Sequence, residues 1–130
     1  MEPKTILIVD DDPATVRLLE LNYRAEGYRV LTGYDGAEGV RQALLGKPDL
    51  IVLDLIMPHL DGYEALRALK SHPETADIPV ILLTGKSDSE DIAEGWTYDI
   101  EFYMTKPYVM EDLLELTERI LSSRDELSLQ

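Results

Sequence analysis

Residues 50–58 read Leu50-Ile51-Val52-Leu53-Asp54-Leu55-Ile56-Met57-Pro58, an apolar run that carries one carboxylate and then ends at a proline. A parallel strand that is covered on both faces is apolar in this continuous way. Asp54 would lie at the carboxyl end of such a strand, where open α/β sheets place their ligand sites. A single carboxylate there can also simply begin a loop. Other segments of the chain are therefore needed to distinguish a ligand site from a loop.

Polar residues also follow three other apolar segments. The acidic triplet at 10–12 follows the first segment, Thr84 follows the fourth and Lys106 follows the fifth. Because parallel strands end at the same edge of their sheet, these groups should converge with Asp54.

Short apolar runs alternate with amphipathic segments five times along the chain. Strands are predicted at Thr5–Val9, Tyr28–Thr32, Leu50–Leu53, Pro79–Leu83 and Phe102–Met104. Helices are predicted at Pro13–Glu26, Gly36–Gly46, Gly62–Ser71, Ser89–Tyr98 and Met110–Ser123. This alternation predicts the α/β class, with a doubly wound five-stranded parallel sheet and helices on both faces.

Capping residues support several of these boundaries. Asp12 is the expected N-cap of the first helix, and Asp35 and Glu38 have the spacing of a capping box. Gly27 and Gly46 are expected to follow helices as C′ residues.

Length and composition indicate one globular domain. The 130 residues are 45% hydrophobic and include no cysteine, which excludes disulfides and thiolate sites. We expect the domain at 1–124 and a polar tail, or the start of a linker, at 125–130. No signal-peptide pattern and no apolar stretch of about 20 residues is present, so a cytoplasmic protein without a membrane segment is expected.

The net charge of −14 opposes contact with nucleic acid or anionic lipid. No direct nucleic-acid role is therefore expected. Most of this acidity can serve solubility, but some carboxylates can instead cluster around a cation.

The polar strand ends offer the parts that phosphoryl transfer to a carboxylate needs. Asp10 and Asp11 can hold a divalent cation, and Asp54 can be both ligand and nucleophile. Lys106 can pair with a phosphoryl oxygen, and the Thr84 hydroxyl can donate to another. Each group alone has a plainer explanation as a cap, a turn or a solvated charge, and their joint occurrence favours a site.

Four segments together form a specific pattern, namely Ile6-Leu7-Ile8-Val9-Asp10-Asp11-Asp12, Val52-Leu53-Asp54-Leu55-Ile56-Met57-Pro58 with Asp61-Gly62, Ile81-Leu82-Leu83-Thr84-Gly85, and Thr105-Lys106-Pro107-Tyr108. On these segments the chain resembles the receiver domain of two-component response regulators, including chemotaxis receivers. The resemblance implies the flavodoxin-like strand order 2-1-3-4-5. It also implies a phosphorylation-activated signalling switch rather than an enzyme, with a sensor histidine kinase or a histidine phosphotransfer protein as phosphoryl donor.

The resemblance further implies roles for single residues. Asp54 would be the phosphoacceptor. Asp11 would bind Mg²⁺ directly, with Mn²⁺ as a plausible substitute. Asp10 would act partly through water, and the backbone carbonyl of Ile56 would be a further ligand.

Other implied roles concern the switch. Thr84 and Lys106 match the switch hydroxyl and the phosphate-pairing lysine. Tyr103 matches an aromatic that turns inward on activation, although its position also suits a half-buried strand residue. The bond between Lys106 and Pro107 would be cis. Separately, the aromatic residues on or near the face of the fourth helix, fifth strand and fifth helix can mark a surface that binds an output domain or effector, or they can simply serve packing.

Three rival functions stay open. A Mg²⁺-dependent phosphatase with an aspartyl nucleophile would carry a second Asp two residues later, where this chain has Ile56, which cannot transfer protons. A flavin-binding module needs a donor-rich phosphate loop, where the triplet at 10–12 would repel phosphate. The third is a receiver-like scaffold that is not phosphorylated.

The sequence predicts a long-lived phosphorylated state. If the resemblance holds, Ile56 and Lys86 flank the water that attacks the aspartyl phosphate, and neither is a good general base at neutral pH. The double variant Ile56→Asn, Lys86→Glu should lose phosphate faster than wild type. The measurement is the decay of phosphorylated protein after the donor is removed. Equal rates, or a faster wild type, would contradict this shielding role.

Overall fold

The computed structural model describes residues 2–55, 62–84 and 102–128, apart from the side chains of residues 84 and 126–128. The elements are β1 (Thr5–Val9), α1 (Pro13–Ala25), β2 (Arg29–Gly33), α2 (Gly36–Gly46), β3 (Leu50–Asp54), α3 (Gly62–Ser71), β4 (Val80–Thr84), β5 (Phe102–Thr105) and α5 (Met110–Ser128). The predicted helix Ser89–Tyr98 lies outside the described residues.

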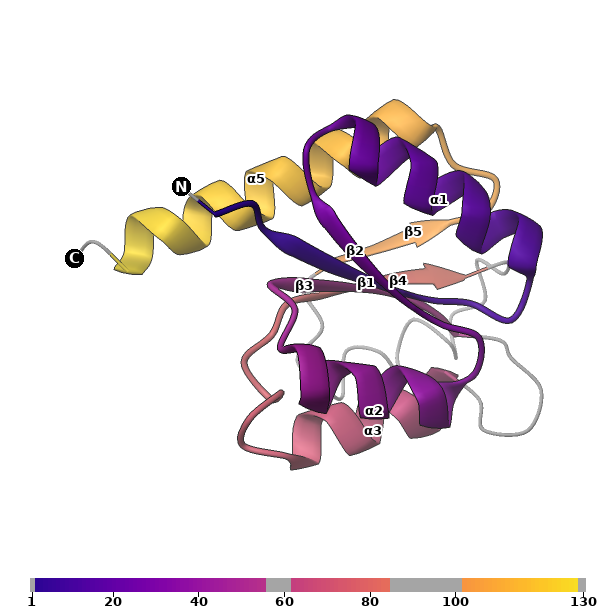
Figure 1. Cartoon of the computed structure of the whole chain (residues 1–130), viewed down its shortest axis with the longest axis vertical. Coiled ribbons are helices and arrows are strands. Elements are labelled where there is room, and N and C mark those ends of the chain that lie inside the picture. Colours follow the sequence, from indigo (N-terminus) through magenta and orange to yellow (C-terminus); the bar gives the residue numbers. More distant parts are fainter. Residues whose placement is uncertain (1, 56–61, 85–101, 129–130) are drawn as a thin grey trace.

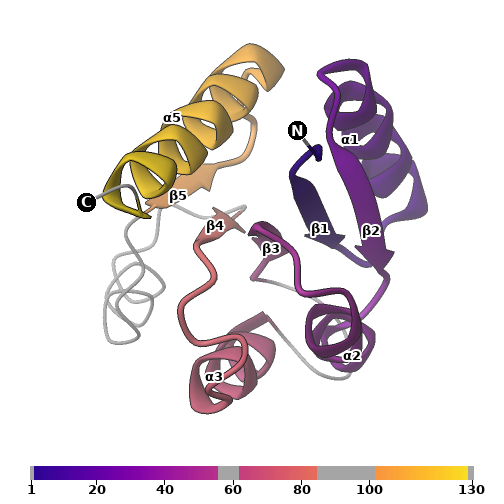
Figure 2. The ribbon, with the colours of Figure 1, turned by 60° about the vertical axis from the view of Figure 1, so that its left-hand side comes forward.

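The five strands form one parallel sheet in the order β2-β1-β3-β4-β5. Helices α1 and α5 cover one face, and α2 and α3 cover the other (Figures 1 and 2). The predicted fold class and the strand order implied by the resemblance are both confirmed. Among the described helices, none combines the length and the apolarity needed to cross a membrane.

Alternate residues of the central strands supply two separate cores. On β3, Leu50 and Val52 pack with α1 and α5, whereas Ile51 and Leu53 pack with α2 and α3. All five residues of β3 are buried, as expected for a strand between two helical layers. The apolar run at 50–53 therefore reflects coverage on both faces.

Most local signals act as the sequence predicts. The Asp12 side chain caps α1 by accepting from the N–H of Ala14, and Asp35 accepts from the N–H of Glu38 at the start of α2. Gly27 follows α1 with φ of 93°, a left-handed conformation that favours glycine.

The prediction for Gly46 is wrong. Gly46 is the last residue of α2, and Lys47 takes the left-handed conformation after it, with φ of 45°. A Cβ at Gly46 would lie 2.3 Å from Cδ1 of Leu31, the end of a flexible side chain that would have to move aside.

Helix α5 is longer than predicted. It continues to Ser128, into the segment that the sequence assigned to a polar tail. Lys4 pairs with Asp125 at 2.9 Å, and Arg124 donates to the carbonyl of Asp77. These contacts hold the later turns of α5 beside the amino ends of the strands.

A buried hydrogen bond joins α1 to α5. The Tyr23 hydroxyl lies 2.8 Å from Thr117 Oγ1, which donates to the carbonyl of Leu113 at 2.9 Å. Because a threonine hydroxyl has one hydrogen, Tyr23 is the donor to Thr117. Burial raises the pKa of Tyr23, so the phenol stays protonated as this role requires.

We predict that Tyr23→Phe destabilises the protein by about 1–2 kcal/mol, because Thr117 Oγ1 loses its donor inside the core. Urea denaturation followed by circular dichroism measures this. Tyr34→Phe is the control, since Tyr34 is exposed and should change stability by no more than about 0.5 kcal/mol. Equal effects of the two substitutions would contradict the prediction.

Candidate functional site

Asp10 follows β1 and is held from several sides. Its N–H donates to the carbonyl of Gly33 at 3.1 Å, which continues the β1–β2 pairing by one residue. Its Oδ1 accepts from the N–H of Asp12 at 2.9 Å, and the residue is only 2% exposed. The carboxylate is therefore fixed at the edge of the sheet.

Three carboxylates meet at this edge. One oxygen each of Asp10, Asp11 and Asp54 lies within 4.8 Å of the others. Asp54 ends β3 and is buried, whereas Asp11 is exposed. The convergence that the sequence predicted is thus present for these residues.

Lys106 brings a positive charge to the carboxylates. Its Nζ lies 3.4 Å from Asp10 Oδ2 and 3.5 Å from Asp54 Oδ2. It follows β5 and is joined to Pro107 by a cis peptide bond. We call Asp10, Asp11, Asp54 and Lys106 the acidic site.

Burial and charge act against each other here. Burial raises the pKa of Asp10 above the ordinary 3.8, and it outweighs the hydrogen bond from the Asp12 N–H and the attraction of Lys106. Burial alone would lower the pKa of Lys106, but Asp10 and Asp54 together outweigh it and raise that pKa above 10.5. The negative charges are therefore only partly compensated by the lysine.

The donor set of the acidic site fits a hard divalent cation. Mg²⁺ prefers oxygen ligands and is often held by one or two carboxylates together with water and phosphate oxygens. Asp10, Asp11 and Asp54 are the candidate ligands, and Lys106 is placed to attract an anion. The arrangement can thus bring a cation and a phosphoryl group to one carboxylate.

The other predicted site residues are placed as follows. Thr84 ends β4 and pairs with Thr105 of β5, but only its backbone is described. Tyr103 is 41% exposed on β5. Ile56 and Lys86 lie outside the described residues.

Asp12 takes no part in the cluster, because its side chain caps α1 and accepts from the Thr15 hydroxyl at 2.7 Å. Tyr108 was not predicted to be a neighbour of the site, yet it is half-buried close to it. Burial raises its pKa; Lys106 acts against this, and Asp10 and Asp54 add to it. Because Tyr108 comes only two residues after Lys106, the sequence could have predicted that it lies near the acidic site.

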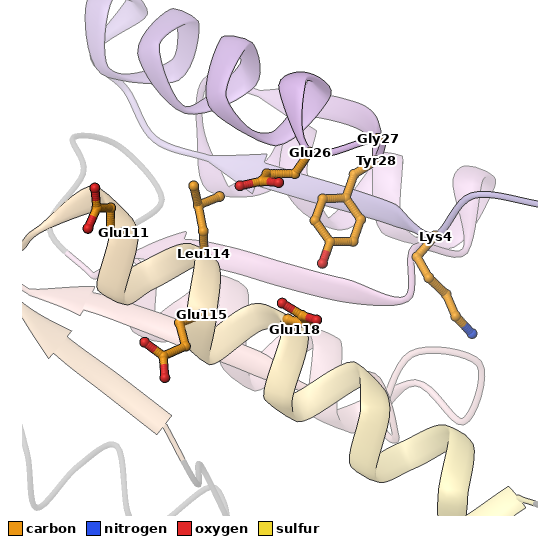
Figure 3. A pocket seen from close by; sticks show the side chains of 8 residues that line it. All are labelled: Lys4, Glu26, Gly27, Tyr28, Glu111, Leu114, Glu115 and Glu118. Carbon is orange, nitrogen blue, oxygen red and sulfur yellow. The ribbon is translucent and has the colours of Figure 1, made fainter.

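A hollow of about 450 Å³ lies between the end of α1 and helix α5, away from the acidic site (Figure 3). Tyr28 and Leu114 face into it, and its lining is completed by Lys4, Glu26, Gly27, Glu111, Glu115 and Glu118. Within the described part of the chain, the only three carboxylates close enough to share a metal ion are those of the acidic site. The hollow is therefore a weaker candidate than the strand ends.

Known proteins resemble this chain along most of its length. The family model of the response regulator receiver domain matches residues 6–118. The transcriptional regulator RpaA of Synechocystis is 38% identical over 122 residues, which are 94% of this chain and 51% of RpaA. The response regulator ArlR of Staphylococcus aureus is 40% identical over 116 residues, 89% of this chain and 52% of ArlR. The chain thus spans about half the length of these curated relatives.

Solved structures show the same fold. The chemotaxis protein CheY4 of Vibrio cholerae is 27% identical with a TM-score of 0.85, over 90% of this chain and 98% of that one. The receiver domain of the sensor histidine kinase PA1611 of Pseudomonas aeruginosa is 30% identical with a TM-score of 0.84, over 92% and 98% of the chains. That structure has a magnesium ion coordinated in its active-site cleft.

We predict that Asp10→Asn raises the melting temperature of the metal-free protein at pH 7. A carboxyl group with a raised pKa in the folded state makes folding less favourable as pH rises through the window above 3.8. The advantage of the variant should therefore grow as pH rises from about 4 and then level off. Thermal melts in a chelating buffer across this range measure it. A variant less stable than wild type at pH 7 would contradict the prediction.

Proposed function

Because the chain belongs to the response regulator receiver domain family, whose members are phosphorylatable signalling domains of two-component systems, we propose that Asp54 is its phosphoacceptor. The position of the Asp54 carboxylate carries the proposal. It is nearly buried, lies within 4.8 Å of the two other carboxylates and is 3.5 Å from Lys106 Nζ.

In the proposed step, a carboxylate oxygen of Asp54 attacks the phosphorus of a phosphohistidine. A bond forms between that oxygen and phosphorus, and the bond from phosphorus to the imidazole nitrogen breaks. The nitrogen keeps the electron pair and takes a proton from solvent. Lys106 compensates the charge of the phosphoryl oxygens.

We assign Asp10 and Asp11 as the residues that hold Mg²⁺, with Asp54 as a further ligand. When bound, the ion supplies positive charge that offsets the phosphoryl oxygens. The support is chemical, since three oxygen donors close together suit this ion. The backbone carbonyl of Ile56 as a further ligand, and Mn²⁺ as a substitute, belong to the same proposal.

The response to phosphorylation is assigned to Thr84 and Tyr103. A phosphoryl group adds negative charge and hydrogen-bond acceptors, so it attracts the Thr84 hydroxyl and Lys106. Strands β4 and β5 are paired in register at Thr84 and Thr105, beside Lys106. A shift of β4 would therefore also shift β5, the strand that carries Tyr103.

We propose a sensor histidine kinase or a histidine phosphotransfer protein as donor. An output domain or effector would bind the face of β5 and α5, together with the predicted fourth helix. With a net charge of −14, this domain is not expected to contact nucleic acid itself. RpaA, whose name describes it as DNA-binding, is about twice as long as this chain.

The phosphoacceptor assignment predicts that Asp54→Asn abolishes labelling. Wild-type protein incubated with acetyl phosphate and Mg²⁺ should gain the mass of one phosphoryl group, measured on the intact protein. Asp12→Asn is the matched control and should label as wild type does, because Asp12 is exposed and Asn is an equivalent cap. Full labelling of Asp54→Asn would move the phosphoacceptor elsewhere.

The metal assignment predicts that Mg²⁺ stabilises the wild-type protein. A ligand at about 100 times its Kd contributes about 2.7 kcal/mol, or on the order of 10 °C in melting temperature for a domain of this size. Asp11→Ala should remove most of this shift. Asp12→Ala should keep it, even though the loss of the α1 cap lowers the starting temperature. An undiminished shift in Asp11→Ala would rule out this ligand.

A further inference from the structure

The first residue of α3 rests on the backbone that follows Asp54. The Gly62 N–H donates to the carbonyl of Leu55 at 2.9 Å, and the Leu55 N–H donates to the carbonyl of Leu83 at 3.0 Å. The end of β3 is therefore held between β4 and the start of α3. This is the segment that carries the Asp54 carboxylate.

No side chain fits at position 62. A Cβ on Gly62 would lie 2.3 Å from the carbonyl oxygen of Asp54 and 2.3 Å from Cα of Leu55. Both neighbours are backbone atoms, and real contacts of a Cβ do not fall below 3.0 Å. Among the described glycines only Gly27 has a positive φ, so Gly62 is needed for space and not for its conformation.

We propose that Gly62 is a positioning residue for the acidic site. Its lack of a side chain lets α3 approach the backbone of Asp54 and Leu55, and this contact fixes the Asp54 carboxylate opposite Lys106 and beside Asp10 and Asp11. The proposal deepens the proposed function and rests on it. The main test of this proposal nevertheless measures Mg²⁺ binding, which does not depend on phosphorylation.

An added methyl group has to displace backbone. The gap must widen from 2.3 to at least 3.0 Å, a shift of 0.7 Å. Ala65, Leu66 and Leu69 anchor α3 in the core below the sheet, so the helix resists moving away. The displacement therefore falls partly on Asp54, and misplacement by about 1 Å can cost on the order of 100-fold in a reaction that depends on position.

The chain offers a matched control. A Cβ at Gly46 would also lie 2.3 Å from its nearest atom, but that atom is Cδ1 of Leu31, the end of a flexible side chain. Gly46 ends α2, and Leu31 lies on β2, a strand that contributes no member of the acidic site. Gly46→Ala thus adds the same group with a similar overlap at a place that should not move Asp54.

The experiment compares wild type, Gly62→Ala and Gly46→Ala at a low temperature at which circular dichroism shows each to be folded. Isothermal titration with Mg²⁺ gives the Kd, and labelling with acetyl phosphate at saturating Mg²⁺ gives the rate. We expect Gly62→Ala to weaken Mg²⁺ binding and slow labelling by at least tenfold each. Gly46→Ala should stay within twofold of wild type in both. Gly62→Ala with a lower melting temperature but unchanged Kd and rate would overturn the proposal, because Gly62 would then be merely structural.

A measurement on wild type covers the case in which Gly62→Ala does not fold. The Gly62 amide should be protected from hydrogen exchange by its bond to Leu55, and its nitrogen shift should follow the Mg²⁺ titration with the midpoint of the site. An amide that exchanges freely, or that does not respond to Mg²⁺, would refute the positioning role. Wild type that binds Mg²⁺ but cannot be phosphorylated would refute the proposed function. The Kd values for Mg²⁺ would then still decide whether Gly62 positions the acidic site.

Discussion

The structure has to hold three mutually repelling carboxylates close together, and the arrangement of its strands and helices depends on this constraint. Oxygens of Asp10, Asp11 and Asp54 lie within 4.8 Å of one another, and like charges at about 4 Å repel by about 4 kcal/mol at the effective dielectric constant near a protein surface. Lys106 offsets part of this by contacting two of them. The repulsion that Lys106 does not offset has to be opposed by the packing that fixes the strand ends. A rigid sheet with a core on each face supplies that packing, because strands covered on both sides cannot move apart without opening one of the cores.

The two helical layers serve the site in different ways. On one face, the bond between Tyr23 and Thr117 joins α1, which begins directly after the acidic triplet, to α5. On the other face, α3 touches the backbone of Asp54 itself through Gly62. The site is thus supported from both layers, while its own residues come from the ends of β1 and β3 and from the position after β5.

Periodicity and strand-end chemistry predicted most of the fold. The bounds of β1, α2 and α3 agree with the prediction. Strands β3 and β5 each end one residue later than predicted, and β2 and β4 are each shifted by one residue at both ends, since the pairing register decides these residues. The acidic cluster was predictable because parallel strands end at one edge. Two features were not. Leu31 of β2 lies where a Cβ on Gly46 would be, and the backbone of residues 54 and 55 leaves no room for a Cβ on Gly62. Both depend on approaches between distant elements, and no local pattern encodes them.

The charge balance of the acidic site explains why a switch can be built from so few groups. Three carboxylates and one ammonium leave two excess negative charges, which a divalent cation would neutralise. An aspartyl phosphate carries more negative charge than the carboxylate from which it forms, so phosphorylation restores the imbalance. With Asp54 as the proposed phosphoacceptor, the excess would then lie on phosphoryl oxygens that extend beyond its side chain. Lys106 is the cation of the acidic site, is about one-third exposed and adjoins β5, so it can follow these oxygens. In the proposed function, Lys106 would therefore compensate the new charge from the β5 side of the acidic site.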